Sequence, residues 1–316
     1  MESPVAILCS GQGSQHPAMF DLVMNSPEAE PVFTAAAEVL GQDPRRFVRE
    51  AAPADLFSDR AGQILCCAQA LAARAALGSA WPTRAVIAGY SIGELAAWGC
   101  AGAVDGPSTL RLAKRRAAAM DAAAPKDSGL AAIVGLLRPT LEPILASNAA
   151  FIAIVNDDDN FTVGGSRAAL HAVCQDATER GAKRAFVLPV AVPSHTPLLR
   201  EATEQFRVVL REASPRLPGA GYRLLSGIDG DTVADIETGI DKLARQISTT
   251  IDWAACLESC QSAGAVAALE LGPGATLSRM ASALFPDGRA RSLDEFRSLA
   301  GLRTWIQRAV AFDTAT

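Results

Sequence analysis

The stretch AVIAGYSIGELAAWG (residues 85–99) places a serine between two glycines, where a run of small apolar residues typical of a strand gives way to a helical pattern. Gly89-Tyr90-Ser91-Ile92-Gly93 fits the pattern G-x-S-x-G, in which a sharp strand-to-helix turn strains the serine backbone and exposes its hydroxyl. The free amides and dipole of the following helix would favour an oxyanion there. The stretch predicts a nucleophile elbow, although Ser91 as a plain helix N-cap is the alternative that the pattern alone leaves open.

Composition and charge narrow the class of protein. The chain has 316 residues, of which 49% are hydrophobic and 20% charged, and a formal net charge of −5. This length suits one large domain or two unequal ones, and the negative charge argues mildly against nucleic acid as the main partner. The seven cysteines form no CxxC pair, which favours reduced core thiols in a cytoplasmic protein. No apolar segment approaches the ~20 residues that span a bilayer, so no membrane partner is expected.

The first part of the chain alternates strands and helices, which predicts a parallel sheet covered on both faces. The expected strands are 5–9 and 84–88, and the expected helices are 28–41, 62–78, 93–101 and 106–123.

From residue 129 the pattern changes to βαββαβ, the order of ferredoxin-like folds. The expected strands are 130–136, 151–155, 161–163 and 185–190, with helices at 140–147 and 167–180. We therefore predict a small ferredoxin-like domain at 129–191, inserted into a large α/β core formed by 1–128 and 192–316. In the returning segment we expect helices near 197–213, 238–248 and 252–263, and strands at 222–226 and 266–271.

A serine nucleophile needs a base, which is most often histidine, and the chain has three histidines. His195 follows a strand and lies between Pro193 and Pro197, which would hold its side chain rigidly. His16 better suits a loop or capping role, and His171 lies in the middle of an amphipathic helix. Because the three histidines are scattered, no metal site is expected.

Five motifs now coincide with one family. They are Gly11-Gln12-Gly13-Ser14-Gln15, Gly89-x-Ser91-x-Gly93-Glu94, Arg116-x-x-x-Met120, Val192-Pro193-Ser194-His195 and Gly272-Pro273-Gly274. In this order they resemble malonyl-CoA:acyl carrier protein transacylases, and the resemblance extends from about residue 5 to residue 285. It implies a hydrolase-like α/β core with a ferredoxin-like insert and an active site in the cleft between them. The variant AGYSIGELAAWGCAG is most similar to the acyltransferase (epsilon) subunit of malonate decarboxylase.

The resemblance also implies roles for residues near the elbow. Ser91 would accept the acyl group and His195 would be its base, as a Ser–His pair in which a backbone carbonyl orients the histidine. The backbone amides of Gln12 and Ile92 would form the oxyanion hole.

Further residues would bind the substrate. Arg116 would grip the free carboxylate of malonate, with Gln63 and Gln246 in supporting hydrogen-bonding roles; on its own, Arg116 could equally be a surface residue of the basic stretch RLAKRR. Two positions depart from the family pattern. Tyr90 stands where a histidine is usual, and Asp158 stands where an asparagine is common, so we expect Asp158 to face solvent.

The implied reaction moves malonyl from malonyl-CoA to the phosphopantetheine-type thiol of an acyl carrier protein, with no bound cofactor. As the decarboxylase subunit, the chain would prime a carrier whose thiol belongs to a phosphoribosyl-dephospho-CoA group, and other decarboxylase subunits would be further partners. The alternatives are a transacylase of fatty acid or polyketide synthesis, a serine esterase with water as the acceptor, and a non-catalytic subunit that docks the carrier.

Overall fold

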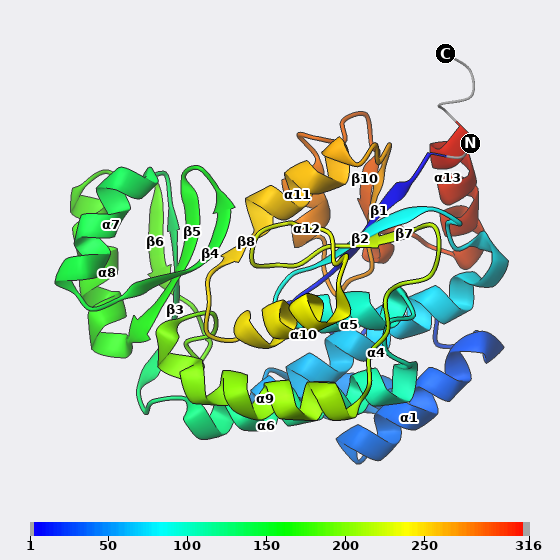
Figure 1. Ribbon diagram of the computed structural model, residues 1–316, viewed down its shortest axis with the longest axis horizontal. Helices are drawn as coiled ribbons and strands as arrows, with labels where there is room; N and C mark the ends of the chain where they lie inside the picture. The colour runs from blue at the N-terminus through cyan, green and yellow to red at the C-terminus, as the bar shows by residue number, and fades with distance from the viewer. Residues whose placement is uncertain (1–2, 312–316) are drawn as a thin grey trace.

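The computed structural model describes residues 3–311, which form two five-stranded sheets side by side (Figure 1). The first sheet is entirely parallel, as predicted, with the strand order β10-β9-β1-β2-β7. Its strands are β1 (Val5–Cys9), β2 (Ala85–Gly89), β7 (Tyr222–Leu224), β9 (Ala268–Glu270) and β10 (Ala290–Ser292).

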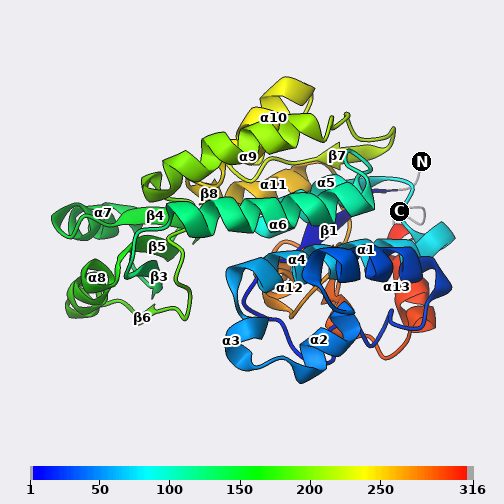
Figure 2. The same cartoon turned by 90° about the horizontal axis from the view of Figure 1, so that it is seen from below.

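Helices cover both faces of this sheet because successive side chains of a strand point to opposite sides. On β1, Val5, Ile7 and Cys9 join one hydrophobic cluster, whereas Ala6 and Leu8 join the other. The first cluster includes residues of α1 (Glu30–Leu40), α4 (Asp59–Leu77), α5 (Ile92–Cys100), α6 (Gly106–Ala123), α9 (Arg200–Glu212), α10 (Ile236–Arg245) and α13 (Leu299–Ala311). The second includes residues of α11 (Trp253–Ser262) and α12 (Thr276–Ala281). Figure 2 shows α9 running beside α6, and both helices belong to the face covered by the first cluster.

The second sheet has the predicted βαββαβ element order, β3-α7-β4-β5-α8-β6, and the strand order β6-β3-β5-β4-β8. Helices α7 (Arg138–Ser147) and α8 (Arg167–Glu179) pack against it through a third hydrophobic cluster. Its strands are β3 (Ser128–Val134), β4 (Phe151–Asp157), β5 (Asn160–Ser166), β6 (Arg184–Val187) and β8 (Ile251–Asp252).

This sheet differs from the sequence-based expectation in several details. Strand β3 lies two residues earlier than expected, and β5 is longer than the expected 161–163. Strand β6 ends at Val187 rather than at residue 190, before Pro189, which has no N–H to donate to a neighbouring strand. Strand β8 pairs in parallel with β4, Ile251 opposite Ile154, although it belongs to the segment predicted for the large core. The domain boundaries at 128/129 and 191/192 stay a prediction.

Several elements were not predicted: the short α2 (Pro44–Glu50), α3 (Pro53–Leu56), β8, β10 and α12, and the longer helix α13. By contrast, helix α6 spans the predicted residues. It begins where the Asp105 side chain accepts a hydrogen bond from the Ser108 amide at 2.8 Å, with Pro107 in the first turn.

Other sequence-level features can be checked directly. All seven cysteines are free, and six of them are buried. Within residues 3–311, none of the helices is long and apolar enough to cross a membrane.

The turn from β2 into α5 is packed so tightly that two positions admit only glycine. A Cβ at Gly93 would lie 2.0 Å from the carbonyl oxygen of Cys9, at the end of β1. A Cβ at Gly89 would lie 2.0 Å from the carbonyl carbon of Gly93. These contacts set the start of α5 directly against the ends of the two central strands.

We expect Gly93→Ala to lower the free energy of unfolding by about 3 kcal/mol or more, because the backbone at Cys9 cannot move away from the added methyl group. Gly106→Ala is the matched control, since Gly106 also lies in the first turn of a helix and its added Cβ meets only Leu71 at 3.9 Å. The control should be neutral or slightly stabilising. Urea denaturation measures both, and equal midpoints would contradict this account of the elbow.

Candidate active site

Ser91 occupies a strained turn at the end of β2. Its backbone has φ 58° and ψ −118°, in the left-handed region that residues with a Cβ rarely adopt. It precedes the first residue of α5, but its side chain makes no capping hydrogen bond to that helix. The geometry is therefore that of the predicted nucleophile elbow, and the capping alternative does not describe it.

The Ser91 hydroxyl is hydrogen-bonded to His195, with 2.8 Å between Oγ and Nε2. On the other side of the ring, Nδ1 faces the backbone carbonyl of Gln246. Because a carbonyl can only accept, Nδ1 carries the proton and Nε2 is left as the acceptor for the serine hydroxyl. This is the protonation state that a general base needs.

The backbone of His195 is also held. Its φ is 61°, and its N–H donates to the carbonyl of Ile247 at 2.8 Å. Only 1% of the residue is exposed. Burial, and secondarily the charge of Arg116, lowers the pKa of His195 to about 3. The imidazole therefore stays neutral well below neutral pH.

The two residues predicted for the oxyanion hole flank the nucleophile. Ile92 is the first residue of α5, so its amide precedes the hydrogen bonds within the helix. The loop that carries Gln12 passes close to Ser91, since a Cβ on Gly11 would lie 3.7 Å from the Cβ of Ser91. The side chain of Gln12 points elsewhere and donates to Asp59 at 2.8 Å.

Arg116 lies on α6 and is 1% exposed, so it is not a surface residue of its basic stretch. Its two terminal nitrogens donate to the side-chain oxygens of Gln63 and Gln246, each at 2.9 Å. Its Nε is buried and has no partner among the described residues. Gln246 also donates through Nε2 to the backbone oxygen of Ser91 at 2.9 Å. The structure thus brings Arg116 together with Gln63 and Gln246, the two residues predicted to support it.

The sequence analysis missed two carboxylates beside this cluster. Asp59 accepts from Gln63 Nε2 at 2.8 Å, and Glu94 accepts from Gln246 Nε2 at 2.9 Å. Burial raises the pKa of Asp59, and it raises the pKa of Glu94 to about 7. The spacing offered a signal, because Asp59 lies one helical turn before Gln63, and Glu94 lies one turn into the helix that follows Ser91.

Tyr90 faces the second sheet. Its hydroxyl donates to Asn156 Oδ1 at 3.0 Å, and its ring meets Trp253 edge-on with 5.5 Å between the ring centroids. Burial raises the pKa of Tyr90 to about 12, so the phenol stays neutral. Asn156, which lies on β4, was not predicted. Asp158 is exposed, as expected.

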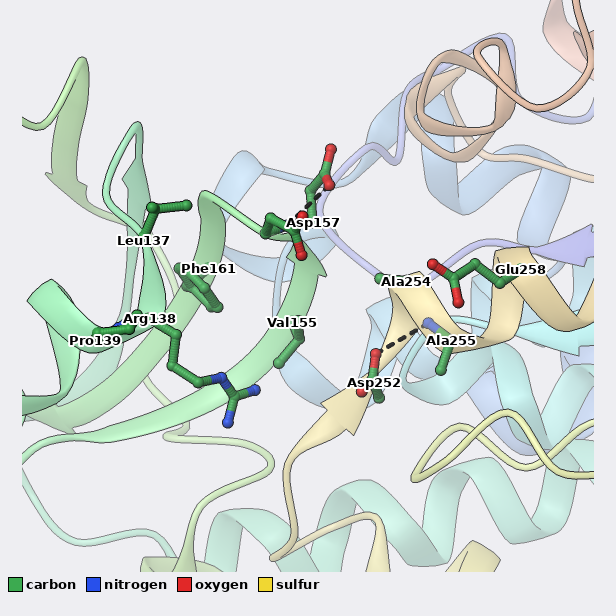
Figure 3. A pocket seen from close by; sticks show the side chains of 11 residues that line it. Leu137, Arg138, Pro139, Val155, Asp157, Phe161, Asp252, Ala254, Ala255 and Glu258 are labelled. Carbon is green, nitrogen blue, oxygen red and sulfur yellow. Dashed lines mark hydrogen bonds between the residues drawn. The ribbon is translucent and has the colours of Figure 1, made fainter.

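The largest of the described cavities adjoins the site and has a volume of about 850 Å³. Gln12, Asp59 and Asp121 line it, together with Pro53, Ala54, Phe57 and Ser58 of α3 and its flanks and residues 188–192 after β6. A second groove, of about 420 Å³, lies between the second sheet and α11 (Figure 3). Its walls carry Arg138, Asp252 and Glu258, and it includes none of the predicted site residues.

The other two histidines lie outside the site. His16 pairs with Asp294, with 2.9 Å between Nε2 and Oδ2, and His171 is exposed on α8. Among the described residues, no group of three or more histidines, cysteines and carboxylates could hold a metal ion.

Comparison with known proteins shows which family has this fold. The family model described as an acyl transferase domain matches residues 7–278 of the chain. The chain belongs to this acyltransferase family. The enzyme is therefore an acyltransferase, and the fold predicted from its motifs is that of the family.

Named relatives span almost the whole acyltransferase chain. The malonyl CoA-acyl carrier protein transacylase of Haemophilus influenzae is 28% identical over 313 residues, which cover 95% of this chain and 98% of that protein. The enzyme of the same name from Bacillus subtilis is 26% identical over 87% of this chain and 89% of its own length. The crystal structure of an acyl-carrier-protein S-malonyltransferase from Burkholderia pseudomallei superposes with a TM-score of 0.87 at 28% identity, covering 95% of this chain and 99% of that one.

We expect the ring Cε1 resonance of His195 in the free enzyme to stay unchanged from pH 8 to pH 5, because its pKa is about 3. In the unfolded chain a histidine takes up a proton near pH 6.5, so the free energy of unfolding should fall as the pH falls below about 6.5. NMR of ¹³C-labelled histidine measures the resonance, and the signal missing in His195→Gln assigns it. A titration midpoint between pH 6 and 7 would refute this reading of the base.

Proposed function

We propose that this acyltransferase moves a malonyl group from malonyl-CoA to the thiol of an acyl carrier protein through a malonyl ester on Ser91. The observation that carries the proposal is the hydrogen bond between Ser91 Oγ and His195 Nε2 beside the buried guanidinium of Arg116. The relatives from Haemophilus influenzae and Bacillus subtilis are named for a transfer between malonyl-CoA and an acyl carrier protein, which supports the same substrates.

The first half-reaction forms the acyl-enzyme. His195 Nε2 takes the proton of the Ser91 hydroxyl while Oγ attacks the thioester carbonyl. The amides of Gln12 and Ile92 stabilise the oxyanion, and one such donor is often worth ~3 kcal/mol in the transition state. The carbon–sulfur bond then breaks, and His195 returns the proton to the leaving CoA thiolate.

The second half-reaction repeats these steps with another thiol. His195 takes the proton of the carrier thiol, whose sulfur attacks the malonyl ester. The ester carbon–oxygen bond breaks, and the proton passes from His195 to Ser91. The cavity of about 850 Å³ supports this proposal, because it offers room for a thiol arm beside Gln12, the residue proposed for the oxyanion hole.

Arg116 would select the acyl group. A guanidinium can hold a carboxylate through two parallel hydrogen bonds, and an acetyl group has no carboxylate to offer. Arg116 forms no ion pair with any of the described residues, so its charge is not already matched by direct contact with a carboxylate.

More specifically, we propose that the protein is the acyltransferase subunit of malonate decarboxylase, because Tyr90 occupies the middle of the elbow. Tyr90 replaces the usual histidine and binds Asn156 of the second sheet. The alternative is a transacylase of fatty acid or polyketide synthesis. A solved malonyl-transacylase in complex with its type II PKS acyl-carrier protein supports that alternative, with a TM-score of 0.87 and 25% identity over 97% of this chain and the whole of that one.

We expect the enzyme to gain the mass of one malonyl group on incubation with malonyl-CoA, and Ser91→Ala to gain none, since within residues 3–311 no other side chain is hydrogen-bonded to His195 Nε2. Intact-protein mass spectrometry makes the measurement. Ser282→Ala, at the exposed serine that directly follows α12, is the control and should label like the parent enzyme.

The same labelled enzyme tests the competing roles. Discharge to a carrier thiol with little loss to water supports acyl transfer, and rapid hydrolysis without a carrier would instead indicate an esterase. Faster discharge to a phosphoribosyl-dephospho-CoA thiol than to a phosphopantetheine thiol supports the decarboxylase role, and the reverse order supports the alternative. Failure of the native enzyme to label would leave only carrier docking.

We expect Arg116→Ala to lower the ratio of kcat/KM for malonyl-CoA over acetyl-CoA by about 100-fold, since a buried charge pair broken at one partner costs about 3 kcal/mol. Arg115→Ala is the matched control, because Arg115 is the next residue along the helix and is exposed. Steady-state transfer with both donors gives the ratio. A ratio that Arg116→Ala leaves unchanged would remove the carboxylate-binding role.

A further inference from the structure

Arg116 stands at the centre of two hydrogen-bonded chains of the same design. One terminal nitrogen donates to Gln63 Oε1 at 2.9 Å, and Gln63 Nε2 donates to Asp59 Oδ2 at 2.8 Å. The other donates to Gln246 Oε1 at 2.9 Å, and Gln246 Nε2 donates to Glu94 Oε2 at 2.9 Å. On each side, a neutral amide separates the guanidinium from a carboxylate.

The carboxylates determine which way each amide points. A side-chain amide has an acceptor at one end and donors at the other, and a guanidinium only donates. A carboxylate only accepts in its ionised form, which Glu94 takes above its pKa of about 7. If Gln63 were flipped, its oxygen would face Asp59 and its NH₂ group would face Arg116, and both contacts would be repulsive. The carboxylate at the far end therefore holds the amide oxygen toward the arginine.

This arrangement also leaves the arginine available to a ligand. Only two of its five N–H groups are used in contacts among the described residues, and Nε is buried without a partner. A carboxylate in direct contact would cancel the charge and occupy the donors that a substrate carboxylate needs. The two amides instead fix the plane of the guanidinium and carry no net charge.

The Glu94 carboxylate is tightly enclosed by the protein. Glu94 is 1% exposed, and a Cβ on Gly227 would lie 2.6 Å from its Oε2, so the carboxylate is enclosed. The Gln246 amide that it orients also donates to the backbone oxygen of Ser91. This side therefore reaches the nucleophile as well as the arginine, whereas the Asp59 side reaches Arg116 through Gln63 alone.

We propose that Asp59 and Glu94 are positioning residues that act through Gln63 and Gln246 to hold the Arg116 guanidinium in a fixed plane with its charge free for the acyl carboxylate. The inference rests on the proposed function, because it assigns the selection of a carboxylated acyl group to Arg116. Each carboxylate meets the glutamine beside it and makes no direct hydrogen bond to Arg116.

The test replaces each carboxylate by the amide of the same shape. Asp59→Asn should lower the ratio of kcat/KM for malonyl-CoA over acetyl-CoA by about 10-fold, chiefly through a higher KM for malonyl-CoA, because the new amide no longer selects one orientation of Gln63. Acetyl transfer should stay within about 2-fold of the parent rate, because it does not use Arg116 and the amide oxygen of the variant can still accept from Gln12. Asp55→Asn, an exposed aspartate in α3, is the matched control and should change neither value.

A second variant and a double-mutant cycle separate positioning from simple damage to the fold. Glu94→Gln should lower both transfers, and the malonyl transfer about 10-fold more, because Gln246 also contacts Ser91. In a Gln63→Leu background, Asp59→Asn should cause no further fall in the ratio, since its effect passes through Gln63. Additive effects of the two substitutions would overturn the proposal.

The outcomes distinguish this inference from the proposed function. If Arg116→Ala abolishes the malonyl preference while Asp59→Asn and Glu94→Gln retain the parent ratio, the positioning role is wrong and the proposed function stands. An equal fall of both transfers in Asp59→Asn would also overturn the positioning role. If Arg116→Ala itself leaves the ratio unchanged, the proposed function fails, and this inference fails with it.

Discussion

The site depends on a guanidinium charge held inside the protein. Arg116 is 1% exposed, and an isolated charge at such a position would be strongly unfavourable without hydrogen-bonding partners. The oxygens of Gln63 and Gln246 contact the guanidinium directly. The carboxylates of Asp59 and Glu94 contact these two glutamines and not the arginine. The same charge acts on its surroundings, because it adds to burial in lowering the pKa of His195. A base that stays neutral and an arginine that stays charged are therefore two consequences of one buried cluster.

Gln246 connects the parts of this cluster. Its backbone carbonyl faces His195 Nδ1, its side-chain oxygen accepts from Arg116, and its side-chain nitrogen donates to the backbone of Ser91 and to Glu94. Gln246 directly follows the last residue of α10 and lies outside the five motifs that indicated the family. A shift of this fully buried residue would disturb Ser91, His195 and the Arg116 guanidinium together.

The sequence indicated the parts of the site that have strong local signatures. The elbow glycines, the start of α6 and the proline-flanked histidine each follow from chain stereochemistry, and the structure places the elbow and the helix where they were predicted. Asp59 and Glu94 could not be found in this way, because an acidic residue in the first turn of a helix is ordinarily read as a favourable interaction with the helix dipole. Their significance comes from glutamines that meet them across 4 residues in one case and 152 in the other. Strand β8 escaped prediction for a similar reason, since a two-residue strand has no periodicity of its own.

The distance between nucleophile and base depends on how the second sheet joins the first. Ser91 precedes β3 in the chain and His195 follows β6, so the chain between the two residues runs through four strands of the second sheet. Three contacts hold that segment in place near the site. Strand β8 pairs with β4, Thr250 donates to the carbonyl of Ile152 at 2.7 Å, and Tyr90 donates to Asn156 at 3.0 Å. The hydrogen bond to Asn156 comes from Tyr90 in the elbow itself. The residue that departs from the usual family pattern therefore also connects the turn at Ser91 to the second sheet. Tyr90 thus acts on the geometry of the site through packing and a neutral hydrogen bond, where a histidine at the same position would bring a titratable group.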